Sequence, residues 1–242
     1  MKTNEWAGKG NWNTALWWEY CVRTGTRKTR DPKPNPSESP YSTFAGNPIW
    51  HSDPYGDTIK TVDWFTLWTN YLKDGTPKDI YNKAGGNVAK LFNDAEAAQK
   101  KDPTKPNGYT NTCALRMSMD LNSSGEEITN EDAKGKYAVK DGEKKNDLLR
   151  VGDMTKLLNK KYGKPDIVLN GNDKDIDKKL KNVHGIIVFE VQGWGDASGH
   201  VTLLNNNLQC GHNCYFQADI DRAHPNNSDK PVIKKVSVWI VQ

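Results

Sequence analysis

Two residues of this sequence have the types and the settings that thiol chemistry requires. Cys113 lies between turn-forming polar residues and an apolar pattern, in the stretch GYTNTCALRMS of residues 108–118. A cysteine reacts as a thiolate, and the dipole of a helix that starts at the cysteine lowers the pKa of its thiol, as does a nearby imidazole. His200 begins a strand pattern after a glycine-rich turn, which leaves room beside its ring. The two residues therefore predict a cysteine nucleophile with a histidine as general base.

A third polar group must hold the His200 ring in the tautomer that faces the thiol. The candidates that follow in the sequence are His212, Asn213, Asp219 and Asp221. The residue types do not decide between them. Spacing alone also leaves a structural interpretation open, in which Cys113 is a small buried side chain and His200 is a hydrogen-bonded residue at a strand edge.

Cys210 and Cys214 lie four residues apart in the turn-rich segment QCGHNCYF. A metal site would need further ligands nearby, and only His212 is available, so a disulfide is the better interpretation and neither a metal nor a cofactor is expected. A disulfide indicates that the protein functions in an oxidising compartment. The N-terminal stretch MKTNEWAGKGNWNT has no apolar region of a secretory signal peptide, which by itself suggests a cytoplasmic protein. These two indications conflict.

The composition favours a water-soluble protein that buries aromatic side chains. Hydrophobic residues make up 35% of the 242 residues, mean hydropathy is −0.84, and nine tryptophans supply much of the area that can be buried. The net charge of +4 comes from no long basic block, so nucleic acid is not an expected partner. No apolar run approaches the roughly 18–20 residues of a membrane span, so no membrane association is expected.

The elements that must position these residues follow an α+β order. Residues 11–22 and 62–72 both read as short helices with aromatic side chains on one face, related by partial duplication or by chance. Residues 31–58 are rich in Pro, Ser, Asp and Gly and predict a linker or an extended segment. The domain organisation expected is an N-terminal extension of residues 1–61 and a catalytic domain of residues 62–242.

The second part of the chain carries a helix that starts at Cys113, with Thr110, Asn111 and Thr112 as candidate caps. A polar surface insertion is expected over residues 122–147. Further helices are predicted over residues 151–162, ending at Gly163, and over the charged segment DIDKKLKN. Four strands are predicted, over residues 185–191, 200–205, 214–220 and 231–241. Helices followed by an antiparallel sheet are typical of the α+β class.

Four stretches carry a resemblance to a known family: NTCALRMSMDLN, GKPD, GIIVFEVQGWGDASGHVTLLN and CGHNCYF. They resemble the type VI secretion amidase effectors of the fourth family, and the similarity runs from about residue 62 to the end of the chain. The resemblance implies an NlpC-type, papain-like fold with a helical N-terminal part packed on an antiparallel sheet. It implies cleavage of the γ-D-glutamyl–meso-diaminopimelate bond of peptidoglycan stem peptides.

The resemblance also implies delivery by the type VI secretion apparatus into the periplasm of a target bacterium, and a cognate immunity protein as partner. Injection needs no signal peptide and the periplasm permits a disulfide, so the conflict noted above disappears. In this sequence, Cys113 matches the family's nucleophile and His200 matches its general base. The orienting residue, usually Asp or Asn, lies between the two paired cysteines. By position His212 falls there, a departure from the family, and Asn213 remains its rival.

Three further residues have two interpretations each. Trp194 either lines the substrate groove or belongs to a turn that needs its glycines. Tyr109 is a candidate donor to the oxyanion, together with the Cys113 backbone N–H. Arg116 is expected to form a buried ion pair that holds the helix rather than to bind substrate.

Two alternative functions remain at this point. A housekeeping cell-wall hydrolase would be expected to carry a signal peptide or a wall-binding repeat, and neither is visible. A non-enzymatic glycan-binding module would use tryptophans as stacking platforms, but most of them lie in helical apolar patterns and read as core.

Overall fold

The computed structural model of the protein describes residues 2–3, 12–14, 19–21, 26–27, 62–194, 197–223 and 230–241. The chain divides into two units, one of residues 62–241 and one that contains residues 1–61. The described part of the latter consists of four short strands paired antiparallel in sequence order: β1 (Lys2–Thr3), β2 (Trp12–Thr14), β3 (Glu19–Cys21) and β4 (Thr26–Arg27).

The helix expected over residues 11–22 is wrong, since β2 and β3 form in its place and pair Trp12 with Cys21. Aromatic residues are common in strands as well as on the buried faces of helices, so the aromatic pattern did not distinguish a helix from a strand. The linker expected over residues 31–58 lies outside the described residues.

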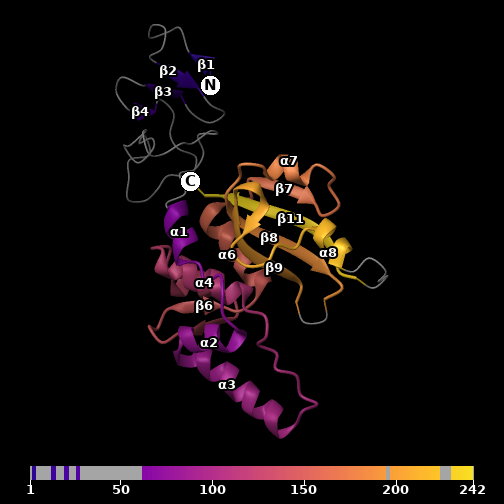
Figure 1. Cartoon of the computed structure of the whole chain (residues 1–242). Helices are drawn as coiled ribbons and strands as arrows, with labels where there is room; N and C mark the ends of the chain where they lie inside the picture. The colour runs from indigo at the N-terminus through magenta and orange to yellow at the C-terminus, as the bar shows by residue number, and fades with distance from the viewer. Residues whose placement is uncertain are drawn as a thin grey trace. The chain divides into compact units, whose positions relative to one another are not determined.

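The unit of residues 62–241 is built on a five-stranded antiparallel sheet (Figure 1). Its strand order is β10-β9-β8-β11-β7. The strands are β7 (Ile167–Asn170), β8 (Gly185–Gln192), β9 (Gly199–Asn205), β10 (Gln209–Cys210) and β11 (Val232–Ile240). β8 and β9 form a hairpin in which Phe189 pairs with His200.

The helices precede the sheet or are inserted between its strands. They are α1 (Trp64–Asn70), α2 (Pro77–Ala84), α3 (Gly86–Lys101), α4 (Cys113–Ser123), α5 (Asn130–Ala133), α6 (Val151–Tyr162), α7 (Ile176–Leu180) and α8 (Gln217–Ala223), with a 3-10 turn η3 (Asn206–Leu208). The α+β class is confirmed, and so are the helices that were predicted from Cys113, from Val151 and in DIDKKLKN. Among the described residues no helix is long and apolar enough to cross a membrane.

The strand expected over residues 214–220 is wrong, because Gln217–Ala223 is helix α8. Phe216 and Ile220 lie four residues apart, and both are buried in the same cluster against the sheet. The short stretch fits a helical turn as well as a strand, and contact with the sheet decides between them.

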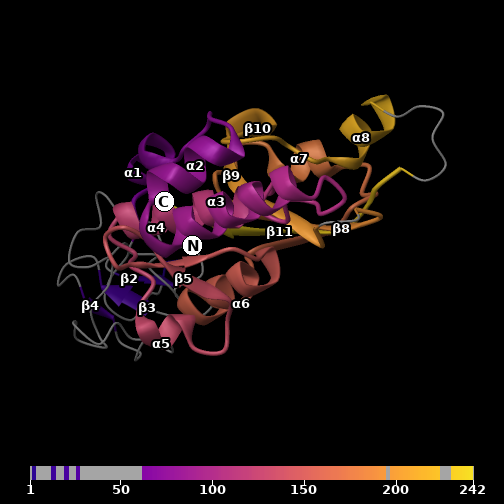
Figure 2. The same ribbon diagram turned by 90° about the horizontal axis from the view of Figure 1, so that it is seen from below.

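The two faces of the sheet carry separate cores. On β8, Ile186 and Val188 pack with the side chains of α4 and α6, whereas Ile187 and Phe189 pack with those of α7 and α8. Figure 2 shows α6 on the side of the sheet opposite to α7 and α8. This alternation follows from the two-residue period of a strand. Nine of the 11 residues of α4 are buried, so α4 is the central helix and its N-terminus is held firmly.

Most of residues 122–147 are exposed or half-buried, as expected of a surface segment, but five of them are buried and the segment contains regular structure. It includes α5 and a hairpin of β5 (Ala138–Lys140) and β6 (Asn146–Leu148), and every residue of β6 is buried against α4. Asn122 of α4 donates to the Asn146 carbonyl and to Asp147 Oδ1, which explains why a polar strand is tolerated inside.

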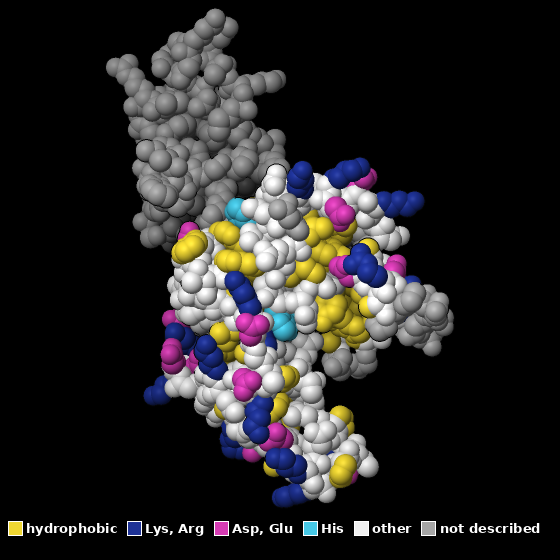
Figure 3. Space-filling model, viewed as in Figure 1, with side chains coloured by type: hydrophobic (Ala, Val, Ile, Leu, Met, Phe, Trp, Pro, Cys, Tyr) yellow, Lys and Arg dark blue, Asp and Glu magenta, His cyan; other side chains and the backbone are white. Residues whose placement is uncertain are grey.

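The outer surface is mixed in charge. On the face shown in Figure 3, basic and acidic side chains alternate over the helices.

Burial of α4 leaves one carboxylate poorly satisfied. Asp120 is 1% exposed, its Oδ2 has no hydrogen-bond partner among the described residues, and burial raises the pKa of this carboxyl to about 8. The folded protein therefore keeps a proton that the unfolded chain, with a carboxyl pKa of 3.8, has released. It follows that the free energy of unfolding contributed by this group falls as pH rises from about 4 to about 8.

Asp120→Asn mimics the protonated acid and has no proton to lose. We expect the variant to be more stable than wild type at pH 8.5, by at least about 1 kcal/mol, with the difference shrinking at pH 5. Urea unfolding at the two pH values measures this, and the contribution of other titrating groups cancels in the comparison. A stability difference that does not change with pH would contradict the buried-acid interpretation.

Candidate active site

The N-terminus of α4 places the candidate nucleophile. Cys113 is the first residue of α4 and is 2% exposed. Thr112 is the N-cap by backbone geometry but makes no capping bond with its side chain. Instead the Asn111 Oδ1 accepts the Cys113 backbone N–H at 3.1 Å, so of the three expected caps Asn111 is the one whose side chain binds the helix start.

Strand β9 brings the candidate base to the same place. Cys113 and His200 line one cavity of about 330 Å³, together with Trp194, His212, Asn213 and Tyr215. The backbone N–H of Val201, next to His200, is directed at the Cys113 thiol and lowers its pKa. Gly199 permits this arrangement, since a Cβ there would lie 2.4 Å from the Phe189 carbonyl oxygen.

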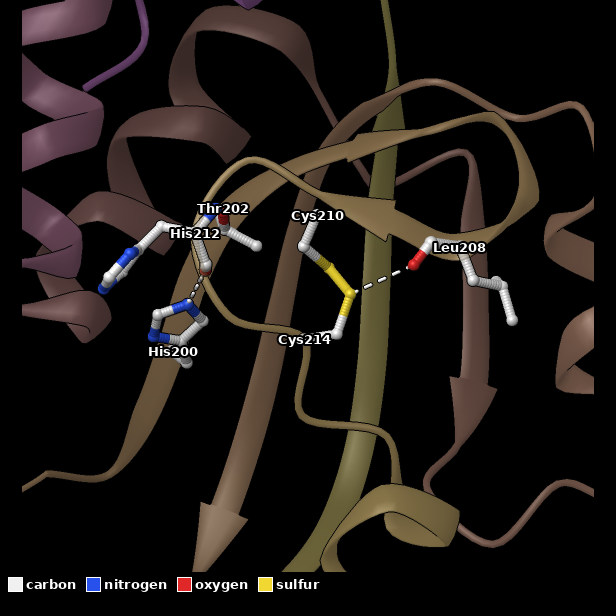
Figure 4. Close-up of a disulfide and its surroundings, with 6 residues drawn as sticks. All are labelled: His200, Thr202, Leu208, Cys210, His212 and Cys214. Atoms are coloured by element: carbon white, nitrogen blue, oxygen red, sulfur yellow. Dashed lines mark hydrogen bonds between the residues drawn. A yellow bond between two sulfur atoms is a disulfide. The ribbon is translucent and has the colours of Figure 1, made fainter. Parts of the chain in front are cut away.

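The tautomer of His200 follows from its partner. His200 Nε2 lies 3.0 Å from the backbone carbonyl oxygen of His212 (Figure 4). A carbonyl oxygen can only accept, so Nε2 carries the proton and Nδ1 keeps a free lone pair. Nδ1 is therefore the nitrogen that can take a proton from a thiol.

The structure does not place the ring of His212 against His200, as the sequence had suggested. The two ring centroids are 6.4 Å apart, and His212 Nδ1 lies 2.9 Å from the Lys73 carbonyl oxygen instead. The His212 backbone N–H donates to Thr202 Oγ1 at 3.0 Å, which holds its peptide beside β9. The expected contact between the rings is thus replaced by a contact through the main chain.

Among the described residues, none of the other candidates for the third group makes a side-chain hydrogen bond to His200. Asn213 is exposed, with a positive φ of 47°, and its amide nitrogen lies 3.5 Å from the Tyr215 hydroxyl. Asp219 pairs with Arg222 and, like Asp221, lines a different cavity beside α8. Neither acid is brought to the cavity that contains Cys113.

A disulfide joins Cys210 and Cys214, with Cα atoms 5.4 Å apart, and Figure 4 shows it beside the His212 segment. The prediction of this bond is confirmed. A loop this short gains only about 2 kcal/mol of stability from the loss of unfolded-chain entropy, so its effect is local. Between the cysteines, Gly211 packs against Tyr71, where a Cβ would lie 2.7 Å from the ring. The disulfide and this contact hold the peptide whose carbonyl accepts the hydrogen bond from His200 Nε2–H.

Burial favours the neutral form of both candidate reacting groups. It raises the pKa of the Cys113 thiol to about 11, although the N–H groups of Val201, Ala114 and Cys113 oppose the shift. It also lowers the pKa of the His200 imidazole to about 4, although the carbonyls of His212 and Asn213 oppose this. The helix start lowers the pKa of the thiol, as expected, through the N–H groups of Ala114 and Cys113, but the loss of water outweighs this effect.

Arg116 lies three residues beyond Cys113 on α4 and is 1% exposed. Its guanidinium donates to the backbone carbonyls of Leu72, Asp74 and Gly75, and its Nε donates to Thr112 Oγ1 at 2.9 Å. Its partners are therefore carbonyls and a hydroxyl rather than the carboxylate of the expected ion pair. The segment of residues 72–75 that Arg116 holds also supplies the carbonyl of Lys73 to His212, so one arginine connects the helix of Cys113 to the peptide beside His200.

Two aromatic residues proposed from the sequence lie near Cys113, in different cavities. Trp194 lines the cavity of His200 and packs edge-on against Tyr215, with ring centroids 4.9 Å apart. Tyr109 lines a neighbouring cavity that also contains Cys113, and its hydroxyl lies 3.5 Å from that of Tyr137. The Cys113 N–H, the other expected oxyanion donor, is bound to Asn111 in the free protein.

The sequence missed Tyr215, whose ring stacks edge-on against His200 at 4.7 Å. Its position directly after a paired cysteine was a usable signal. In the part of the chain that the structure describes, no three His, Cys, Asp or Glu side chains gather as ligands for a metal ion.

The main-chain contact to His200 has a direct test. His212→Ala keeps the carbonyl and loses the ring's contacts with the Lys73 carbonyl and the Asn213 amide, so we expect hydrolytic activity to fall by about 10-fold or less. Asn213→Ala serves as the matched control and should be close to wild type. A loss with His212→Ala as large as that with His200→Ala would return the orienting role to the ring.

Comparison with known proteins identifies the family. A sequence model of the family Tae4, the type VI secretion system (T6SS) amidase effector protein 4, matches residues 109–239, just over half of the chain. Tae4 from Salmonella typhimurium, solved with the immunity protein Tai4 from Enterobacter cloacae, is 28% identical; the match covers 75% of this chain and 99% of that one, with a TM-score of 0.60. A Tae4–Tai4 complex from Salmonella Typhimurium is 26% identical over 76% of this chain and 100% of that one, with a TM-score of 0.59.

Tae4 from Enterobacter cloacae, solved alone, has a similar fold: it is 24% identical over 76% of this chain and 99% of that chain, with a TM-score of 0.58. A search of curated protein sequences found no significant match. The family match agrees with the position of a cysteine at the start of a buried helix beside a histidine on an antiparallel sheet. The chain belongs to the Tae4 family of type VI secretion amidase effectors and is an enzyme that acts on peptidoglycan.

Proposed function

We propose that the protein is a cysteine amidase that cleaves the γ-D-glutamyl–meso-diaminopimelate bond of peptidoglycan stem peptides. The observation that supports this most is the single cavity lined by Cys113 and by His200, whose Nε2–H is bound to a carbonyl. That bond leaves Nδ1 as a base for the thiol. Membership of an amidase effector family supports the choice of an amide substrate.

The reaction starts with an uncharged Cys113 thiol and an uncharged His200 imidazole. His200 Nδ1 takes the thiol proton as the Cys113 sulfur attacks the γ-glutamyl carbonyl carbon, and an imidazolium and a tetrahedral oxyanion form together. The carbonyls of His212 and Asn213 favour the charged ring, since both raise the pKa of His200. The imidazolium then protonates the amine as the C–N bond breaks. Water, deprotonated by His200, finally hydrolyses the thioester and restores the thiol.

The site of action is the periplasm of a target bacterium, reached by type VI secretion. There the disulfide between Cys210 and Cys214 is chemically stable. Tae4 proteins of two bacterial species have been solved with Tai4 immunity proteins, which supports a cognate immunity protein as a partner of this chain.

Digestion of purified muropeptides with the intact protein, followed by mass spectrometry, tests the proposed bond. We expect one product that ends in D-glutamate and one that begins with meso-diaminopimelate. Products cut at another amide would refute the bond, and the absence of any cleavage would refute hydrolysis and leave the glycan-binding alternative.

The domain boundary is a proposal with its own test. We propose that residues 62–242 carry the chemistry and that residues 1–61 are dispensable for it, because the described residues that line the Cys113–His200 cavity all come from the second unit. A protein that starts at Thr61 should cleave small muropeptides within about 3-fold of the intact chain, since it keeps all of these lining residues. Loss of activity in a truncation that keeps its circular dichroism spectrum would show that the N-terminal unit helps to build the site.

A further inference from the structure

A second cavity adjoins the one that holds His200. It has a volume of about 650 Å³ and shares Cys113 and Asn111 with the first cavity. Its other lining comes from the residues before α4, from the start of α6, from three tyrosines and from the end of the β8–β9 turn. The tyrosines are Tyr81, Tyr109 and Tyr137, and the charged lining residues are Arg150, Asp153 and Lys156. The thiol therefore stands at the junction of two cavities.

The position of His200 assigns the two halves of an amide substrate to these cavities. His200 must reach the nitrogen of the leaving amine in order to protonate it, and it lines only the smaller cavity. The amine half then lies in the smaller cavity. The acyl half, on the other side of the carbonyl that Cys113 attacks, extends into the larger one.

Among the described residues, Arg150 is the cation of the larger cavity that forms no ion pair. Lys156 is paired with Asp153 at 3.1 Å, and Asp153 also accepts the Tyr137 backbone N–H at 3.0 Å. Arg150 is exposed, and among the described residues its guanidinium contacts only the face of the Tyr137 ring, 4.6 Å from the centroid. That stacking orients the guanidinium while its five N–H donors stay available.

The start of α6 adds to the positive potential beside Arg150. The helix has 12 residues, and the side chain of its N-cap residue, Arg150, makes no capping hydrogen bond. The one acidic residue of its first turn, Asp153, is already bound to Lys156 and to the Tyr137 N–H. Gly152 in the first turn lines the cavity, so the backbone is open to a ligand there. A guanidinium next to an uncapped helix start suits a carboxylate.

A γ-linked acyl residue presents such a group. When the side-chain carboxyl of glutamate forms the amide, its α-carboxylate remains free and lies on the acyl side of the scissile bond. Building on the proposed amidase function, we propose that the larger cavity is the acyl-side subsite and that Arg150 binds the α-carboxylate of the γ-linked D-glutamate. Arg150 would thereby distinguish stem peptides with a free D-glutamyl carboxylate from those in which this group is amidated to D-isoglutamine.

The test uses the intact protein and three stem peptides: one with all carboxylates free, one with the D-glutamyl α-carboxylate amidated, and one with the free carboxylate of the diaminopimelate amidated. We expect wild type to prefer the first over the second by about 10- to 100-fold in kcat/KM, as for a lost hydrogen bond to a charged group. Arg150→Gln should lower kcat/KM for the first peptide by a similar factor and change the rate on the second by less than about 3-fold. Arg150→Lys should recover part of the preference, because it restores charge without the planar fork.

Arg222→Gln on α8 is the matched control, because it removes an exposed arginine that lines another cavity. An equal loss with Arg150→Gln on all three peptides would overturn the proposal in favour of a structural role. A preference that depends on the diaminopimelate carboxylate would overturn the acyl-side assignment. Wild type that cleaves none of the peptides would refute the amidase function itself, whereas cleavage without any preference would refute only the subsite.

Discussion

Cys113→Ala should lower muropeptide hydrolysis by at least about 1,000-fold, because the variant has no atom that can form the thioester. His200→Ala should lower it by a comparable factor, since the neutral thiol has then no base. The need for a base is greater here than for a preformed thiolate, because burial raises the pKa of Cys113 to about 11 and the thiol is protonated at neutral pH. The measurement is the initial rate of muropeptide cleavage, followed by mass spectrometry.

Both variants should fold, which makes the loss interpretable. Cys113→Ala removes one sulfur from a buried position, and we expect the free energy of unfolding to fall by less than about 2 kcal/mol. Circular dichroism and a urea unfolding curve provide the control. Retention of wild-type cleavage by either folded variant would exclude the Cys113–His200 pair as the catalytic centre.

Arg116→Met should have the largest effect on stability. The guanidinium satisfies three backbone carbonyls in the segment of residues 72–75, and Nε donates to the hydroxyl of Thr112 at the start of α4. Methionine fills a similar volume but donates nothing, so we expect the free energy of unfolding to fall by about 3–5 kcal/mol. Activity should also fall, because the segment of residues 72–75 that supplies the Lys73 carbonyl to His212 loses its anchor.

Lys90→Met is the control for the loss of a long cationic side chain. Lys90 forms an exposed pair with Asp94 on α3, and such pairs contribute less than about 1 kcal/mol. Urea unfolding of the two variants compares the buried and the exposed cation directly. If Arg116→Met is no less stable than Lys90→Met, the buried arginine does not hold the segment.

Local sequence patterns correctly predicted the elements that have long periodic sequences and clear boundaries. α6 ends at Gly163, whose φ of 76° favours glycine, and α4 starts where polar residues give way to an apolar stripe. β8 was recognisable as a strand buried on both faces, because it is apolar almost throughout. These features are decided within about a dozen residues, so the sequence suffices.

The errors fell on short segments. Residues 214–220 and 11–22 contain aromatic and apolar side chains at spacings that suit a helix or a strand. The polar strand β6 looked like surface, because the groups that satisfy it inside belong to α4. Propensity is weak over so few residues, and tertiary contacts override it.

The same distinction between local sequence and tertiary contacts applies to the residues of the candidate site. A thiol at a helix start and an imidazole at a strand start are properties of residue types and local spacing, so the sequence alone pointed to Cys113 and His200. The group that orients His200 is a backbone carbonyl, which every residue has, and no pattern of side chains marks it. Only the tertiary structure selects the carbonyl of His212, because the Cys210–Cys214 disulfide, Thr202 and the segment held by Arg116 fix that peptide beside β9. The net pKa values of the two reacting groups were equally beyond the sequence, since they depend on how much water the folded chain excludes.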